Sequence, residues 1–205
     1  MAQFSLHSFQ GVLFDLDGVL VDSYDCWFRL LQDSMREQGK TPVTAEEFHS
    51  RWGQGIEADR DAFFPEWTME QLTRFYEQRF PGYTGFTRCE PGADLLLKRL
   101  RQSNRKIAIA SNSPTLVIED LLRSAGLIEY PHLIVGADQV KEAKPAPDML
   151  YKALEGLCLR IEEACYVGDS IFDSSAADAA GMFFVGYKRP GMVSVQNLDE
   201  LSCLF

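Results

Sequence analysis

The sequence has no excess of positive charge and no long hydrophobic run. Its 205 residues include 20 lysines and arginines against 30 aspartates and glutamates, which gives a formal net charge of -10. Nucleic-acid binding depends on surplus basic side chains, so this balance argues against a nucleic-acid partner. No segment approaches the roughly eighteen consecutive apolar residues of a membrane span, and residues 1–9 lack the pattern of a targeting segment. We therefore expect no membrane association.

Cysteine is also scarce and follows no pattern. The five cysteines are odd in number, scattered, and free of C-x-x-C spacing. A disulfide framework or a zinc site would need such regular pairs, so neither is predicted. We expect reduced thiols and a cytoplasmic protein, either a monomer or a homodimer. The 46% hydrophobic content is enough for a sizeable core.

Short apolar runs that end in polar residues recur along the chain and predict buried strands. They cover residues 11–14, 106–110, 133–135 and 165–167. Helical patterns lie between them or follow them, at residues 93–101, 114–124, 147–157 and 173–180, with Ser113 suited to cap the second of these helices. Alternating strands and helices predict an α/β fold with a parallel sheet covered on both faces. Ligands of such sheets bind at the carboxyl ends of the strands.

The strand pattern is missing from residues 23–88, where amphipathic helices are predicted instead, including 27–38 and 69–80. Thr44 with Glu47, and Thr68 with Gln71, have the spacing of capping boxes and mark two helix starts. We expect a discontinuous α/β catalytic core of residues 1–22 and 89–205. The inserted helical domain, residues 23–88, leaves the core after its first acidic loop and should lie over the crevice.

The chemistry is predicted to centre on Asp15 and Asp17, which follow the first apolar run. An aspartate can attack phosphorus to form an aspartyl phosphate, and a neighbouring carboxyl group can protonate the leaving oxygen. Clustered carboxylates need a cation to offset their repulsion. Asp169, at the end of another strand, can complete an oxygen-rich site of the kind that Mg²⁺ prefers. Asp173, four residues on, can orient a ligand or Lys144 from behind.

Ser111, Asn112 and Lys144 are the predicted phosphate-binding residues. Ser111 and Asn112 follow a strand and precede a helix, where hydroxyl and backbone N–H groups can face an anion. Lys144 adds a positive charge in a loop stiffened by prolines. Taken singly, each motif also fits a turn, a helix start or a solvated loop. Their shared position at strand ends favours a common site.

At this point the chain resembles the haloacid dehalogenase superfamily over nearly its whole length, in its phosphoglycolate phosphatase and β-phosphoglucomutase-like branch. The similarity rests on the Asp15-Leu16-Asp17-Gly18 segment, on Ser111-Asn112, on Lys144-Pro145, and on Gly168-Asp169-Ser170 with Asp173. It implies a Rossmann-like core with a helical cap. It also implies that Asp15 is nucleophile and Mg²⁺ ligand, that Asp17 adds a backbone carbonyl ligand, and that Asp169 binds the metal.

The resemblance implies a magnesium-dependent phosphatase acting on a small phosphomonoester. Gly168 departs from the mutase pattern, in which an acidic residue usually precedes the motif aspartate, so a sugar phosphomutase is the alternative and a non-catalytic binding protein a third possibility. Arg51, Trp52 and Gly53 in the predicted cap are candidate substrate contacts, and so is Tyr24 beside the catalytic loop. Each of these four can equally be an ordinary packing or surface residue.

Overall fold

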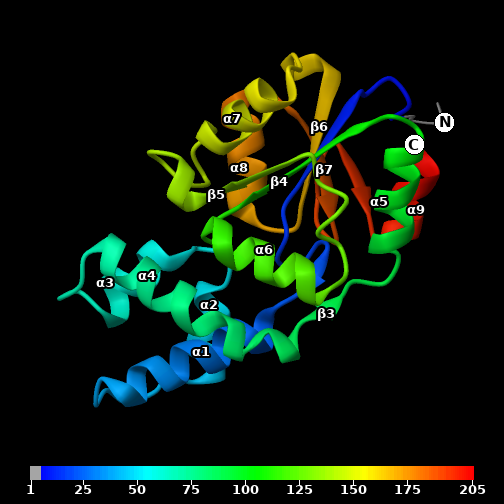
Figure 1. Ribbon diagram of the computed structural model, residues 1–205. Coiled ribbons are helices and arrows are strands. Elements are labelled where there is room, and N and C mark those ends of the chain that lie inside the picture. The colour runs from blue at the N-terminus through cyan, green and yellow to red at the C-terminus, as the bar shows by residue number, and fades with distance from the viewer. Residues whose placement is uncertain (1–5) are drawn as a thin grey trace.

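The computed structural model describes residues 6–205 and has an α/β core with a helical segment at one end (Figure 1). The main sheet has six parallel strands in the order β5-β4-β1-β6-β7-β8, and a small antiparallel pair joins β2 to β3. The strands are β1 Gly11–Phe14, β2 Val21–Asp22, β3 Arg88–Cys89, β4 Lys106–Ser111, β5 Leu133–Gly136, β6 Ala164–Gly168, β7 Phe183–Tyr187 and β8 Val193–Val195. The expected parallel α/β fold is confirmed.

The helices of the described chain fall into two groups. The first group forms a helical segment, residues 24–86, made of α1 Tyr24–Glu37, α2 Ala45–Arg51, α3 Ile56–Phe63, α4 Met69–Arg79, and the short 3₁₀ turns Phe80–Gly82 and Thr84–Phe86. The second group surrounds the sheet and consists of α5 Ala93–Gln102, α6 Thr115–Ser124, α7 Asp148–Leu157, α8 Ile171–Ala180 and α9 Leu198–Leu204, with 3₁₀ turns at Ala137–Gln139 and Ile161–Glu163.

Alternation along the strands divides the core into two layers. In β1, Val12 and Phe14 belong to the apolar cluster shared with α5, α6 and α9, whereas Leu13 belongs to the cluster shared with α7 and α8. In β4, Ile107 likewise belongs to the first cluster and Ala108 to the second. Successive side chains of a strand point to opposite faces, so the sheet is buried on both sides. This burial explains why its strands read as nearly continuous apolar runs.

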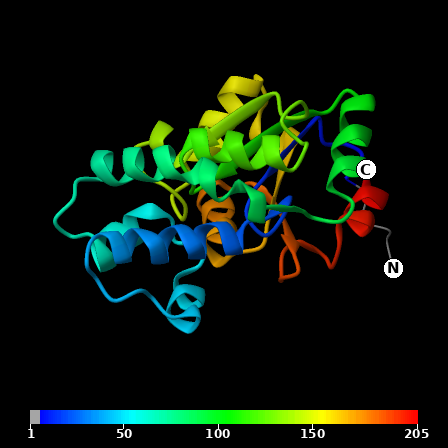
Figure 2. The same cartoon turned by 60° about the horizontal axis from the view of Figure 1, so that its bottom comes forward.

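The helical segment leaves and re-enters the core at one point, where Val21 pairs with Cys89 in the β2–β3 ribbon. Figure 2 shows the segment extending from the core on the side away from the C-terminus. Both expected capping boxes are present, since the Thr44 and Thr68 hydroxyl groups accept the backbone N–H of Glu47 and Gln71. The prediction for Ser113 was wrong, because Pro114 occupies the N-cap of α6 and the Ser113 hydroxyl bonds elsewhere.

The elements agree with the expected ranges to within a few residues, except where no element was predicted. Strands β2, β3, β7 and β8 and helix α9 were not foreseen. No helix within residues 6–205 has both the length and the apolar character needed to cross a membrane.

Candidate active site

The candidate site forms where three neighbouring strands end. Asp15 follows β1, Ser111 closes β4, and Asp169 follows β6, and these strands are adjacent in the order β4-β1-β6. The backbone N–H of Asp15 donates to the Val167 carbonyl at 2.8 Å, which extends the strand pairing to the site itself. Parallel pairing therefore brings together side chains that lie far apart in the sequence.

Asp15 lies at the base of this site, with only 7% of its surface exposed. Its Oδ1 accepts a hydrogen bond from the Leu16 backbone N–H at 2.8 Å and lies 2.9 Å from the Lys144 Nζ. Burial and the negative charge of Asp173 raise the Asp15 pKa well above its usual value, although Lys144 acts in the opposite direction. A buried carboxylate in this position favours a nearby cation.

Lys144 is buried and lies between two carboxylates. Its Nζ is 2.9 Å from Asp15 Oδ1 and 2.8 Å from Asp173 Oδ1, and it also contacts the Tyr166 hydroxyl at 2.9 Å and the Ala110 carbonyl at 3.0 Å. Burial alone would lower the Lys144 pKa, but the two carboxylates hold it above its usual value. Lys144 is therefore a fixed positive charge beside the Asp15 carboxylate.

Asp173 is fully buried at the start of α8 and is held by several hydrogen bonds. Its Oδ1 accepts from Lys144 and from the Tyr166 hydroxyl at 2.6 Å, and its Oδ2 accepts from the Ser170 backbone N–H at 2.9 Å. Burial would raise the Asp173 pKa, but Lys144 and these hydrogen bonds hold it below its usual value. Both oxygens have protein partners, so this side chain is suited to positioning Lys144.

Asp17 accepts hydrogen bonds from three serine hydroxyl groups. Ser23 donates to its Oδ1, while Ser111 and Ser113 each donate to its Oδ2 at 3.1 Å. Ser23 is the N-cap residue of α1, whereas Ser111 and Ser113 lie at and just after the end of β4, so the carboxylate joins two separate segments. The arrangement holds the Asp17 carboxylate at the edge of the cavity that Asp15 and Ser111 also line.

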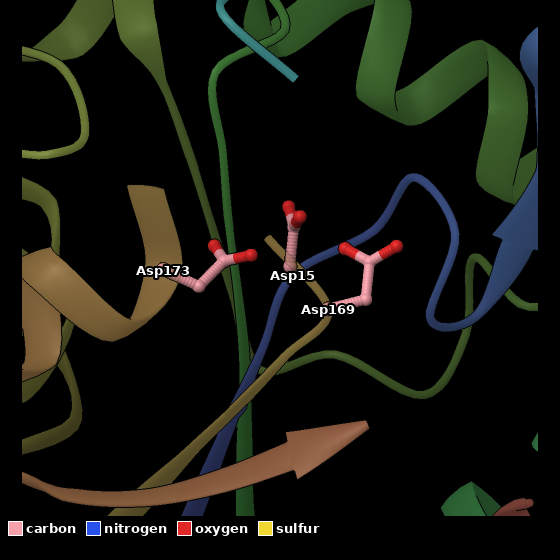
Figure 3. A group of neighbouring side chains, drawn as sticks. All are labelled: Asp15, Asp169 and Asp173. Carbon is pink, nitrogen blue, oxygen red and sulfur yellow. The ribbon is translucent and has the colours of Figure 1, made fainter. Parts of the chain in front are cut away.

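Asp169 approaches Asp15 from the end of β6. Figure 3 shows the Asp15 carboxylate between those of Asp169 and Asp173, and one oxygen of each lies within 4.8 Å of the others. Burial and the charge of Asp173 raise the Asp169 pKa to about 7. The first loop reaches Asp169 at Gly18, where φ is 83° and an added Cβ would lie 2.2 Å from Asp169 Oδ2. This position requires glycine.

The Asn112 side chain joins the core to the helical segment. Its Nδ2 donates to the carbonyls of Gly53, at 3.2 Å, and Lys144, at 3.0 Å, and its Oδ1 accepts the Lys144 backbone N–H at 2.9 Å. These bonds occupy the amide, so any contact of Asn112 with a phosphate would come from its backbone. An added Cβ on Gly55 would lie 3.1 Å from the Asn112 Cβ, which shows how closely the two parts approach.

A cavity lies between the carboxylates and the helical segment and holds about 670 Å³ of empty space, counting the part open to solvent. Asp15, Asp17, Ser111, Asn112, Lys144 and Asp169 line it from the core. Arg51, Trp52 and Gly53 line it from the opposite side. Tyr24 is not among the described residues that line it: its ring packs against Phe48 and Trp52, with centroids 5.0 and 5.2 Å away.

Three neighbours of the site were not predicted to be site residues from the sequence. The Tyr166 hydroxyl contacts both Lys144 and Asp173, the Ser113 hydroxyl donates to Asp17, and Asp59 lines the cavity from α3. Tyr166 could have been suspected, because it lies in the strand that leads to Asp169. No local pattern pointed to Asp59.

A parallel α/β sheet with carboxylates and a buried lysine at the ends of its central strands defines a class of enzyme that works at the carboxyl edge of the sheet. The sequence model of the family described as "haloacid dehalogenase-like hydrolase" matches residues 12–187. A phosphoglycolate phosphatase of Photorhabdus laumondii is 34% identical over 215 residues, covering 97% of this chain and 90% of that protein. The chain belongs to the haloacid dehalogenase-like hydrolase family.

Solved structures agree with this assignment. A hydrolase of the same superfamily, subfamily IA, variant 1, from Geobacter sulfurreducens superposes with a TM-score of 0.80 at 26% identity, covering 96% of this chain and all of that one. A β-phosphoglucomutase from Clostridium difficile gives a TM-score of 0.79 at 20% identity, covering 94% of this chain and 93% of that one. The second similarity concerns the fold alone.

Proposed function

We propose that this protein is a magnesium-dependent phosphatase that hydrolyses a small phosphomonoester through an aspartyl phosphate on Asp15. The observation that carries the proposal is the buried Asp15 carboxylate, 2.9 Å from Lys144 and facing Asp169 across the base of the cavity. The relatives named phosphoglycolate phosphatase support phosphomonoester hydrolysis. The α/β core and the helical segment, divided near residues 22 and 89, would act as catalytic domain and cap.

The residues present fit a divalent cation. Asp15 and Asp169 both have raised pKa values because burial leaves their negative charge poorly compensated. These two carboxylates, with the Asp17 backbone carbonyl, would hold Mg²⁺, whereas Asp173 is already engaged by Lys144, Tyr166 and Ser170. Bound there, Mg²⁺ supplies charge stabilisation for the phosphoryl oxygens.

In the first step, an Asp15 carboxylate oxygen forms a bond to phosphorus as the bond from phosphorus to the ester oxygen breaks. Asp17 in its protonated form gives its proton to that departing oxygen, and the alcohol leaves. In the second step, Asp17 takes a proton from water as the water oxygen forms a bond to phosphorus and the bond from the Asp15 oxygen to phosphorus breaks. Inorganic phosphate is released and Asp15 is regenerated. Lys144 and Ser111 would bind the phosphoryl oxygens during both steps.

Gly168 supports hydrolysis over the phosphomutase alternative. A Cβ at this position would lie 2.4 Å from the Asp173 Cβ, so an acidic side chain before Asp169 has no room. The intact cluster likewise weighs against a non-catalytic binding protein. A cytoplasmic location belongs to the same proposal and is supported by the five cysteines, all of which are free thiols.

The test is phosphate release from p-nitrophenyl phosphate with Mg²⁺, followed by a panel of phosphorylated metabolites that includes phosphoglycolate. Asp15→Asn should reduce turnover at least about a thousandfold, equivalent to roughly 4 kcal/mol of transition-state stabilisation. Glu46→Gln, an exposed change at the start of α2, is the matched control. Undiminished turnover by Asp15→Asn would exclude Asp15 as the nucleophile, and isomerisation of a hexose phosphate without free phosphate would favour the mutase.

A further inference from the structure

The wall of the cavity opposite Asp15 is mostly apolar, with Trp27, Phe48 and Ile56 among its residues. Among the described residues of the helical segment, two ionisable side chains line this wall, those of Arg51 and Asp59. A substrate whose phosphate lies near Lys144 would direct its alcohol portion towards this wall. The chemistry of Arg51 and Asp59 therefore bears on which alcohol can leave.

Asp59 is fixed in place from behind. The hydroxyl of Tyr76, a fully buried residue of α4, donates to Asp59 Oδ2 at 3.0 Å. The Tyr76 ring packs against Trp27 and Phe64, with centroids 5.7 and 6.5 Å away. A carboxyl group anchored through one oxygen in this way can present its other oxygen to a ligand in a defined direction.

Arg51 is the one cation that the described residues of the helical segment place on this wall, where it packs on an aromatic ring and interacts electrostatically with Asp59. Its guanidinium carbon lies 5.3 Å from the centroid of the Phe63 ring, at the end of α3. Its charge also acts on Asp59, where it opposes the effect of burial, which raises the Asp59 pKa to about 7. The pair is therefore close to neutral overall when Asp59 is ionised.

The charges around the whole cavity lead to the same conclusion. Asp15, Asp17, Asp169 and Asp59 line it, and Arg51 and Lys144 are its cations. One Mg²⁺ would balance the net negative charge of these side chains, and the phosphoryl group of a substrate then adds close to two negative charges. A carboxylate on the leaving group would add one more negative charge beside Asp59, and the charge of Arg51, the one cation on the described part of this wall, is already balanced by ionised Asp59. A hydroxyl group adds none and can hydrogen-bond with the Asp59 carboxyl group.

We propose that Asp59 determines leaving-group specificity and that it selects a phosphomonoester with a neutral hydroxyl group, of the polyol or sugar phosphate class, over one with a carboxylate. This inference rests on the proposed phosphatase function and narrows its substrate class. The proposed preference differs from the one that the name of the phosphoglycolate phosphatase relatives suggests, because phosphoglycolate carries a carboxylate.

Two matched pairs of esters test the proposal. 2-Hydroxyethyl phosphate and phosphoglycolate differ only in hydroxymethyl against carboxylate, and glycerol 3-phosphate and 3-phosphoglycerate differ in the same way. With Mg²⁺ present, the wild-type kcat/KM should be at least tenfold higher for the hydroxyl member of each pair. Asp59→Asn should reduce this ratio about tenfold, mainly through better use of the carboxylated esters.

Glu57→Gln is the control, because it makes the same chemical change at an exposed carboxylate of the same helix that does not line the cavity. It should leave both ratios unchanged. A wild-type preference for the carboxylated esters, or equal ratios in Asp59→Asn and wild type, overturns the proposal. If Asp59→Asn does not fold, the wild-type ratio of kcat/KM for the hydroxyl and carboxylated esters still tests the proposed preference. Absence of phosphate release from every ester, p-nitrophenyl phosphate included, would instead remove the phosphatase function and this inference with it.

Discussion

Replacing Lys144 by methionine should destabilise the protein strongly. The Lys144 ammonium lies 2.8 Å from Asp173 and 2.9 Å from Asp15, and all three side chains are almost completely buried. Removing one member of a buried ion pair leaves the other charge uncompensated, at a cost of about 3–5 kcal/mol. Asp15 can escape part of this cost by binding a proton, because its pKa is already raised. Asp173 should therefore account for most of the loss.

Urea unfolding at pH 7 with EDTA, which removes any bound metal, measures the effect. A loss of 3–5 kcal/mol corresponds to a decrease in Tm of about 6–20 °C for a chain of this length. The effect should also depend on pH. In the wild type the Asp173 pKa is held below its usual value, so its stabilising contribution is present above about pH 4 and is lost as pH falls through the lower folded value. The difference between the two proteins should shrink over the same range.

Two further variants test the electrostatic explanation. Lys141→Met removes an exposed lysine of the same loop and should change the free energy of unfolding by less than about 0.5 kcal/mol. Adding Asp173→Asn to Lys144→Met removes the uncompensated charge and should recover at least half of the loss. The reasoning is refuted if Lys144→Met stays within about 1 kcal/mol of wild type, or if the double variant is no more stable than the single one.

Three other changes probe the site and the cavity wall. Asp17→Asn should reduce kcat/KM, which reports on phosphoryl transfer to Asp15, about 10²–10⁴-fold for an alkyl phosphate. The loss should be much smaller for p-nitrophenyl phosphate, whose phenolate leaves without a proton, and equal losses of kcat/KM for the two esters would argue against an acid role. Gly168→Ala places a methyl group 2.4 Å from the Asp173 Cβ and should cost about 1–3 kcal/mol in urea unfolding, so an unchanged midpoint would contradict the close contact. Because burial raises the Asp59 pKa to about 7, the folded state retains a proton that the unfolded chain releases, and stability should fall by up to about 4 kcal/mol between about pH 4 and 7. Asp59→Asn should remove that part of the pH dependence of the unfolding free energy. Identical pH profiles for Asp59→Asn and the wild type would rule out this contribution of Asp59.

The parts of the fold that local pattern encodes could be predicted from the sequence. Apolar runs that end in Asp15, Ser111 and Asp169 identify buried strands, and parallel pairing then requires their ends to meet. The run Phe183–Tyr187 carries the same signal, and β7 could have been inferred from it. Side-chain partners could not be inferred in this way. The Asn112 amide bonds Gly53 and Lys144, and the sequence gives no measure of those distances.

The incorrect placement of Ser113 shows a similar limit. A serine before a proline at a helix start favours an N-cap locally. In the folded protein its hydroxyl donates to Asp17, which lies almost a hundred residues earlier in the chain. The pairing of Asp59 with Tyr76 likewise depends on how α3 and α4 pack together. Such contacts are decided by tertiary structure, and no local propensity encodes them.

The central position of β1 determines when this protein can become active during folding. Gly11 pairs with Lys106 on one side and with Ala164 on the other. The strand that leads to Asp15 is therefore synthesised early, but it is paired on both sides only after β6 has been synthesised. A nascent chain that ends before Ala164 holds Asp15, the proposed nucleophile, without Asp169 beside it. Closing such distant pairs is the slow part of folding for parallel sheets. Catalytic activity should therefore appear only once β6 has joined the sheet, which makes it a direct reporter of the finished core.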